Sequence, residues 1–382
     1  MNDNHPKYTI KGILLDNNNW EKYKLLHSGL DKWKIKEVEK MLLCRDPKNG
    51  FHAYYCKDCD FSFIRPHSCN SRVCSVCGRN HIERWTKKTV KRMFNVNHSH
   101  IVFTLPKVLW NLVKDNQKCI KELSDTTFRV VRETMSRAAK KEITPGEISA
   151  FHSYGNEMNI NTHFHTIVTE GGNDKNGNWK DVYYFPYRIM RFKWRDYAVD
   201  IIKKHVNMTE ENQMIFEMID VTYKNGFNVK RKKGGIPKKE LVGYIARYVR
   251  HPPVSNRRII DYNGKGVTFF CEDKEKGLKW FVTLTVEEFI TRILWHIPPK
   301  NFKMIRYYGL YSRINYPRTQ IRKDKQESIT VFFVRNNCAE CPKCGEMLEP
   351  IGYYAPYSHN GPPEIERFGM RITDWCSVVS AR

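Results

Sequence analysis

The stretch NINTHFHTIV, residues 159–168, decides the expected fold because polar and apolar side chains alternate along it. Such alternation predicts a half-buried β-strand, in which residues two apart face the same way. His163 and His165 then share one face of the strand, and Phe164 packs into the core behind them. Two neighbouring imidazoles make half of a metal site, although an isolated pair is more often two ordinary surface or core histidines.

A third metal ligand has to come from a neighbouring strand. His152 is the best candidate, because the short strand expected at 151–154 could pair beside the histidine strand. His98 and His100, at the start of the apolar strand HIVFTL at 100–105, are weaker choices, and an Asn, Gln or Glu could also serve. The sequence thus favours a metal site on one face of a sheet.

The segments around this strand predict an α+β domain with an antiparallel sheet, because helices and strands interleave and several strands are joined by hairpins. Gly171-Gly172 and Asn176-Gly177 are the turn signals. The expected helices cover 107–142, 187–206, 237–249 and 285–297, and the expected strands cover 100–105, 151–154, 163–169, 182–185, 214–222, 267–271 and 279–284.

Two tyrosines, Tyr244 and Tyr248, stand four residues apart in the helix expected at 237–249. On a helix this spacing places both side chains on one face, with their Cβ atoms about 5–6 Å apart. By itself the pattern is more typical of two aromatic rings that pack on a sheet. A phenol has an unperturbed pKa of about 10. As a nucleophile it therefore needs a metal-polarised phosphate and nearby cations, which Arg247 and Arg250 supply.

Twelve cysteines, nine of them in two short clusters, point to metal rather than to disulfides. Four thiolates from two C-x-x-C knuckles satisfy tetrahedral zinc, and the expected ligands are Cys56, Cys59, Cys74 and Cys77. Other nearby residues could form a second site or replace a member of the first: Cys44, His67, Cys69 and His81. A later C-x-x-C-x-x-C run offers three thiolates of a further zinc, Cys338, Cys341 and Cys344.

The 382 residues carry 65 Lys and Arg against 41 Asp and Glu, which gives a formal net charge of +24. A surface this basic favours a polyanionic partner, usually nucleic acid. No run approaches about 18 apolar residues, so no membrane span is expected, and the N-terminus lacks the pattern of a secretory signal. The basic residues expected to contact DNA are Arg72, Arg79, Arg247, Arg250 and those of a basic loop, Lys230, Arg231, Lys232 and Lys233.

The order of these motifs resembles the two-tyrosine HUH transposases of rolling-circle insertion sequences, the family numbered ninety-one. The resemblance spans roughly residues 30 to 315, and several linked motifs in one order are far more specific than any one of them. Thr162 stands where many members carry proline, which should leave the strand intact. The matching pieces are HSCNSRVC at 67–74, HIVFTLP at 100–106, NTHFH at 161–165, TEGG at 169–172, YIARYV at 244–249, HIPP at 296–299 and RYYGL at 306–310.

The resemblance implies a single-strand DNA endonuclease and strand transferase with an HUH-nuclease core, a central antiparallel sheet flanked by helices. Tyr244 and Tyr248 are then the nucleophiles, which form a 5′-phosphotyrosine and release a 3′-hydroxyl. His163 and His165, with His152 as a third ligand that matches less directly, hold Mg²⁺ or Mn²⁺, which polarises the scissile phosphate. The cysteines hold structural Zn²⁺.

The implied organisation is a zinc- and DNA-binding domain at 1–95, an endonuclease domain at 96–318 and a cysteine-bearing tail at 319–382. The implied partners are single-stranded DNA, hairpin-bearing element ends and target DNA, without a membrane and with self-association left open. The implied location is the cytoplasm of a prokaryote, in association with the nucleoid.

Two other functions fit parts of the sequence. A plasmid or phage rolling-circle replication initiator would use the same chemistry. The DNA flanking the gene would distinguish the two, because element ends with a subterminal hairpin indicate a transposase and a replicon origin indicates an initiator. A non-catalytic zinc DNA-binding protein would need neither the tyrosines nor the histidine pair.

Overall fold

The computed structural model divides the chain into two units, Met1–Glu37 with Ser75–Tyr316 and Val38–Cys74 with Pro317–Arg382. The units differ from the expected segments, because part of the C-terminal tail joins the N-terminal cysteine segment. The side chains of residues 232, 247–249 and 350–354 are not described. The structure describes residues 6–232, 237–249, 251–273, 276–312, 341 and 343–354.

A six-stranded sheet forms the centre of the first unit. Its strand order is β11-β4-β5-β3-β7, with β6 paired to β5, and every pairing is antiparallel. The sheet confirms the expected α+β class. Its strands are β3 (His98–Thr104), β4 (Thr144–Tyr154), β5 (Ile160–Asn173), β6 (Trp179–Asp181), β7 (Val229–Lys232) and β11 (Ile305–Gly309).

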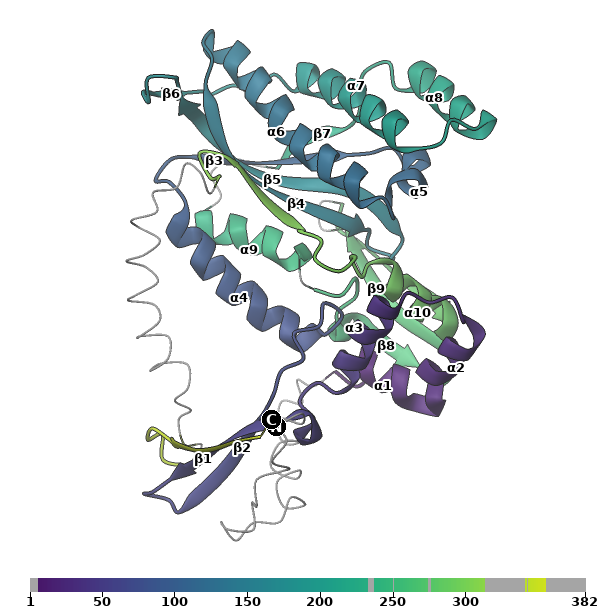
Figure 1. The fold of residues 1–382 in the computed structure, drawn as a ribbon, viewed down its shortest axis with the longest axis vertical. Helices are drawn as coiled ribbons and strands as arrows, with labels where there is room; N and C mark the ends of the chain where they lie inside the picture. The colour runs from purple at the N-terminus through teal and green to yellow at the C-terminus, as the bar shows by residue number, and fades with distance from the viewer. Residues whose placement is uncertain are drawn as a thin grey trace. The chain divides into compact units, whose positions relative to one another are not determined.

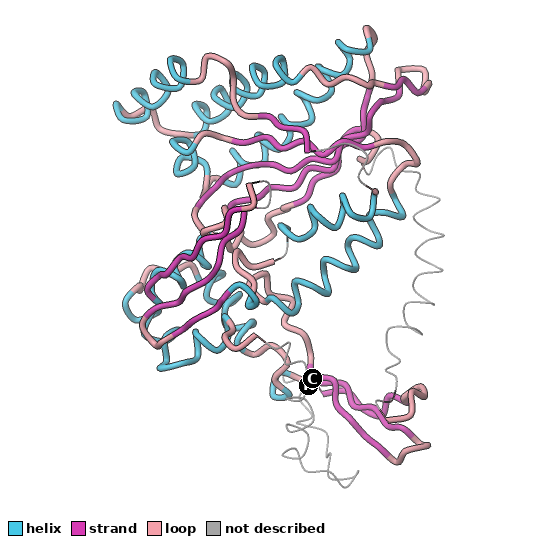
Figure 2. Tube along the Cα trace, turned by 180° about the vertical axis from the view of Figure 1, so that it is seen from behind, coloured by secondary structure: helices cyan, strands magenta, loops and turns pink. Residues whose placement is uncertain are grey.

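Helices cover both faces of this sheet (Figures 1 and 2). The rings of Phe103 and Phe164 meet Trp194 edge-on, with ring centroids 5.3 and 5.9 Å apart, and all three side chains are fully buried. Burying such side chains stabilises the fold by about 1.5–3 kcal/mol each. One face carries α6 (Gln117–Ala139), α7 (Tyr187–His205) and α8 (Glu210–Thr222), and the other carries α4 (Ser75–Arg92) and α9 (Lys238–Val249).

A smaller antiparallel sheet, in the order β10-β9-β8, completes the first unit. The hydroxyl of Thr285 accepts a hydrogen bond from the backbone N–H of Glu288 at 3.1 Å and so caps the helix expected at 285–297. The elements of this region are α1 (Ile10–Leu15), α2 (Asn19–Leu26), α3 (Lys32–Leu42), β8 (Ile259–Tyr262), β9 (Gly266–Asp273), β10 (Leu278–Thr285) and α10 (Val286–Trp295).

The second unit contains a three-stranded antiparallel sheet in the order β12-β1-β2. Strands β1 (Phe51–Cys56) and β2 (Phe61–Pro66) form a hairpin, and β12 (Glu349–Tyr354) pairs with β1 from the C-terminal segment. A small core forms around Tyr54 and Leu348. Residues nearly three hundred positions apart in the sequence therefore share one sheet.

Residues 214–222, expected to form a strand, belong to helix α8. Their β-branched and aromatic side chains favour a strand, but Thr209 accepts a hydrogen bond from the backbone N–H of Asn212 and begins a helix. The residues that α8 buries are Phe216 and Ile219, three positions apart. Helical spacing, not alternation, therefore describes the buried face.

Three other expectations change. The basic segment at 230–233 was expected to be a loop, but residues 230–232 belong to β7, which pairs with β3. The helix expected at 107–142 is interrupted, because Asn116 accepts a hydrogen bond from the N–H of Cys119 and begins α6. The strand expected at 182–185 lies earlier, as β6. The strand expected at 151–154 is the end of the longer β4.

The other expected helices and strands are confirmed to within a few residues. They are those at 100–105, 163–169, 187–206, 237–249, 267–271, 279–284 and 285–297.

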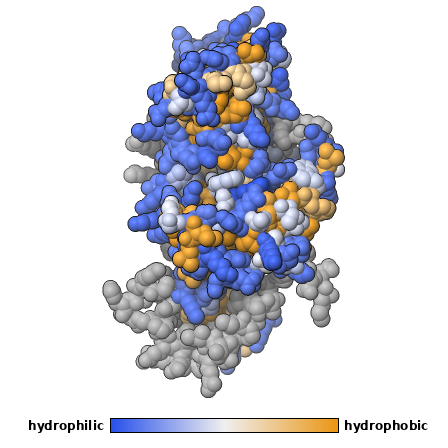
Figure 3. All heavy atoms as spheres, turned by 90° about the vertical axis from the view of Figure 1, so that its right-hand side faces the viewer, coloured by the Kyte–Doolittle hydropathy of each residue, from blue (hydrophilic) through white to orange (hydrophobic). Residues whose placement is uncertain are grey.

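No helix in the described part of the chain is both long and apolar enough to span a membrane. On the face that Figure 3 shows, apolar side chains gather in patches that hydrophilic side chains surround. Helix α8 contributes exposed apolar residues such as Met214 and Val221.

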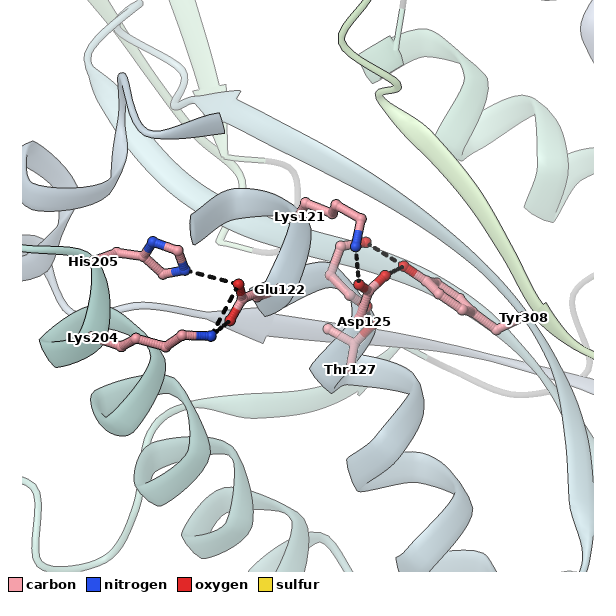
Figure 4. Close-up of polar contacts among 8 residues, drawn as sticks. Lys121, Glu122, Asp125, Thr127, Lys204, His205 and Tyr308 are labelled. Atoms are coloured by element: carbon pink, nitrogen blue, oxygen red, sulfur yellow. Dashed lines mark hydrogen bonds and ion pairs between the residues drawn. The ribbon is translucent and has the colours of Figure 1, made fainter. Parts of the chain in front are cut away.

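Polar contacts fasten α6 to its neighbours (Figure 4). Tyr308 of β11 donates to Asp125 at 2.8 Å and lies 3.1 Å from the hydroxyl of Ser124. Glu122 contacts Lys204 and His205, at the end of α7, at 3.0 Å each. Helix α6 is thus held to the edge strand β11 and to α7.

Glu147 of β4 is a fully buried carboxyl beside α6. Its Oε1 accepts a hydrogen bond from the hydroxyl of Thr127 at 2.7 Å, while its Oε2 contacts no polar group among the described residues. Burial raises the pKa of Glu147 to about 8, even though the Thr127 hydrogen bond lowers it. The carboxyl is therefore largely protonated at neutral pH.

The Glu147→Gln variant should become more stable relative to the wild type as pH rises from 4.5 to about 8. The folded carboxyl keeps its proton over this window whereas the unfolded one loses it, so the wild type loses stability at up to about 1.4 kcal/mol per pH unit. Glutamine does not ionise. Urea unfolding at several pH values measures the difference, and a difference that stays constant would contradict the assignment.

Candidate active site

The pairing of β4 with β5 brings three histidines together. His152 lies opposite His163 in the register, and Ala150 lies opposite His165. The Nδ1 atom of His152 is 2.7 Å from Nε2 of His163, which is 3.2 Å from Nε2 of His165. The structure therefore brings together the three histidines that the sequence selected.

Each histidine on β5 has a partner for its other ring nitrogen. Nδ1 of His163 donates to the carbonyl oxygen of Asn161 at 2.7 Å, and Nδ1 of His165 lies 2.9 Å from Nε2 of His100. Such contacts orient imidazole ligands and fix the tautomer that leaves Nε2 available to a metal. His100, a weaker candidate for the third ligand, therefore supports His165.

Burial keeps the ligand histidine of β4 neutral. His152 is 3% exposed, and burial lowers its pKa well below the usual value, as do the nearby charges of His163, His165 and His296. His296 is half-buried, and the loss of solvent lowers its pKa to about 4. Its Nε2 donates to the carbonyl oxygen of Met158 at 3.0 Å. A neutral imidazole is the form that binds metal.

The donor set suits a divalent transition-metal ion. An ion about 2.1 Å from each nitrogen, with its ligands at right angles as in octahedral coordination, would place the nitrogens about 3 Å apart, close to the observed distances of 2.7 and 3.2 Å. All three donors are imidazole nitrogens, which suit transition metals, whereas Mg²⁺ prefers oxygen. Of the two ions that the sequence suggests, Mn²⁺ is the transition metal, and both also bind oxygen ligands such as those of a phosphate.

Tyr244 of α9 faces the same side of the sheet as the histidines. Its ring centroid is 5.2 Å from that of His100 and 5.9 Å from that of His165. Tyr248 lies one turn later in α9, and its side chain is outside the described part. A second ring, that of Tyr154, lies 4.0 Å from His152, but burial raises the pKa of Tyr154 above its usual value. Tyr244 is thus the better placed nucleophile among the described tyrosines.

The sequence offered no signal for some of these contacts. Tyr154, His296 and the carbonyl of Asn161 lie beside the three histidines. Asn161 and His296 belong to the motifs NTHFH and HIPP, but neither motif indicated that these residues lie beside the histidine cluster. His100 lies in the strand HIVFTL, and only its pairing opposite Ile167 on β5 places it beside His165.

The cysteines group differently from the expected set of Cys56, Cys59, Cys74 and Cys77. One group joins Cys44, Cys69, Cys74 and Cys77, and the other joins Cys56, Cys59, Cys341 and Cys344. The hairpin explains the division, because six residues at about 3.3 Å each separate its turn at 56–59 from its open end at 67–69. Neither group includes His67 or His81, and Cys338 lies outside the described residues.

The basic residues expected to contact DNA differ in their surroundings. Arg79 on α4 and Lys230 on β7 are exposed, whereas Arg231 pairs with Glu170 and Arg72 is half-buried. Helix α4 packs beside α9 and exposes further cations at Arg84, Lys87, Lys88 and Lys91. The side chains of Lys232 and Arg247, and all of Lys233 and Arg250, lie outside the described residues.

Replacing His152 by alanine should weaken Mn²⁺ binding at least about tenfold, because one of three nitrogen donors is lost. Electron paramagnetic resonance of free Mn²⁺ during a titration measures this change. His98→Ala is the matched control, since His98 is buried on the same sheet face but contacts Tyr311 at 2.6 Å. An equal loss in both variants would remove His152 from the metal site.

Two family models match the chain. Residues 15–105 match a model described as "Transposase zinc-binding domain", of the IS91 type. Residues 146–319 match the Y2 transposase model, described as "Putative transposase". Together they cover about two thirds of the chain, in the order that the sequence motifs suggested.

Two known proteins are similar over most of their length. The transposase for insertion sequence element IS801 of Pseudomonas savastanoi pv. phaseolicola is 29% identical over 325 residues, which are 80% of this chain and 77% of that protein. "Putative transposase y4qJ" of Sinorhizobium fredii is 26% identical over 310 residues, 76% of this chain and 77% of that protein. No solved structure matches the chain. The two domains and the relatives agree: the chain belongs to the IS91 family of transposases.

Proposed function

We propose that this transposase nicks and rejoins single-stranded DNA through 5′-phosphotyrosine intermediates, as in rolling-circle transposition. The observation that carries the proposal is the position of Tyr244, whose ring lies 5.9 Å from His165 on the face of the sheet where three imidazoles converge. A nucleophile and a metal-binding cluster on one face can act on the same phosphate.

Tyr244 attacks the phosphorus of the scissile phosphodiester. The bond from its Oη to phosphorus forms as the bond from phosphorus to O3′ breaks, the phenol loses its proton, and the leaving O3′ gains one. The energy of the phosphodiester is conserved in the new bond, so the reverse reaction rejoins the strand without ATP. A divalent ion held by His152, His163 and His165 would neutralise charge on the phosphate.

The surroundings of Tyr244 position it for this attack. Leu241, Val242 and Ile245 are buried and pack α9 into the core of the first unit, so the helix is a rigid support. Tyr244 itself is half-buried, which lets its hydroxyl reach a ligand. A fixed nucleophile loses less entropy in the transition state than a mobile one.

Single-stranded DNA is the proposed substrate. The helix beside α9 exposes Arg79, Arg84, Lys87, Lys88 and Lys91, and the chain carries a net charge of +24. Phosphate contacts of this kind dominate affinity for nucleic acid and weaken as salt rises. Hairpin-bearing element ends and a target strand would follow the same basic path to the tyrosine.

Tyr244→Phe should abolish the covalent adduct, a loss of at least about a thousandfold, because phenylalanine keeps the ring and removes only the attacking oxygen. The assay uses a single-stranded element end labelled at its 3′ end, with Mn²⁺, on a denaturing gel. The label should migrate with the protein, since the downstream fragment carries the phosphotyrosine.

Tyr154→Phe is the matched control, because its ring also touches the histidine cluster, and it should keep the adduct. Tyr248→Phe should keep the first adduct and fail to complete strand transfer, since the second cleavage needs a second nucleophile. Adduct formation by Tyr244→Phe at the wild-type rate would overturn the assignment of Tyr244, and an adduct peptide that contains only Tyr248 would reverse the order of the two tyrosines.

A further inference from the structure

Four thiols from opposite ends of the sequence meet in the second unit. Cys56 and Cys59 lie at the turn between β1 and β2, and Cys341 and Cys344 lie just before β12. The four sulfur atoms all lie within 4.8 Å of one another, and those of Cys56 and Cys344 are 3.6 Å apart. Tetrahedral zinc with four thiolates needs sulfur atoms about 3.8 Å apart, from Zn–S bonds of about 2.3 Å.

The two C-x-x-C turns share one backbone feature. Asp60 and Gly345, each directly after the second cysteine of its turn, both have positive φ angles, +47° and +79°. This conformation turns the chain back after the second thiol. Glycine adopts it without strain, and aspartate tolerates it better than most residues.

Backbone N–H groups point at the first sulfur of each turn. The N–H of Cys59 hydrogen-bonds to the sulfur of Cys56, and the N–H groups of Lys343 and Cys344 hydrogen-bond to the sulfur of Cys341. Such contacts orient and stabilise thiolate ligands. Both turns are therefore built as metal-binding knuckles.

Other contacts hold the C-terminal knuckle in place. Strand β12 pairs with β1, and Lys57 forms an ion pair with Glu349 at 2.8 Å. The ammonium of Lys343 lies 4.5 Å from the centroid of the Phe61 ring. Leu348 is buried in the small core with Tyr54. The approach of the two knuckles thus follows from a shared sheet and core.

We infer that Cys56, Cys59, Cys341 and Cys344 form a second, composite zinc site, in which the C-terminal segment supplies half of the ligands of the N-terminal domain. The zinc-binding match ends at residue 105 and the transposase match ends at residue 319, so two of the four ligands lie beyond both. The other group of four thiols is Cys44, Cys69, Cys74 and Cys77. The inference is independent of the proposed nicking chemistry.

Zinc counting in the full-length protein tests the composite site. Two double variants, Cys56→Ser with Cys59→Ser and Cys341→Ser with Cys344→Ser, should each lose one zinc per chain by plasma mass spectrometry. The quadruple variant should lose no more than either double variant, because all four thiols share one ion. Cys271→Ser is the matched control, since this cysteine lies in β9 and in neither group, and it should lose none.

Two results would overturn the inference: a Cys341 and Cys344 double variant that retains all of its zinc, or a quadruple variant that loses two ions. Misfolding is a separate outcome, which circular dichroism and size-exclusion chromatography of each variant beside the wild type detect. If a variant misfolds, the zinc in the wild-type protein is replaced by Co²⁺ and the bound cobalt ions are counted instead. Intense thiolate–cobalt absorption from two ions per chain supports the inference, and absorption from one ion overturns it.

Discussion

The register between β4 and β5 is the constraint on which the histidine cluster depends. It places His152 opposite His163 and, through the alternation of β5, sets His165 on the same face. A slip of one residue would turn the histidines of one strand toward the opposite face. Strand β3 adds His100 from the other side of β5, so the cluster and its supporting imidazole come from three neighbouring strands.

The two faces of this sheet hold different titratable groups. On one face, imidazoles gather where a cation can bind, and burial keeps that of His152 neutral. On the other, Glu147 is held neutral beside Thr127 and α6. Both faces avoid an unpaired buried charge, which would be costly in a dry interior. The difference is that the histidine face has a half-buried tyrosine above it and the Glu147 face is closed by a helix.

Local pattern predicted much of the fold and of the catalytic candidates. Alternation identified β5, and the H-x-H pair with a nearby histidine identified the cluster. Pattern failed at α8, where β-branched residues favoured a strand and a Thr209 cap decided for a helix. It also failed for the cysteines, because spacing identifies a knuckle but not its partner. Which knuckle pairs with which is set by the hairpin, whose strands are six residues long, and by the pairing of β12 with β1. Local sequence does not encode either contact.

The pairing of β1 with β12 also orders events during synthesis. The second unit is interrupted by the whole of Ser75–Tyr316, so β1 leaves the ribosome long before the strand that completes its sheet. Cys56 and Cys344 are 288 positions apart, and at about 5–20 residues per second the delay is roughly 15–60 seconds. A chain that stops early, by a nonsense codon or a frameshift, would keep the histidines and Tyr244 but leave an open strand edge. Such an edge invites aggregation, so truncated copies of the protein should be poorly soluble and readily removed by proteases.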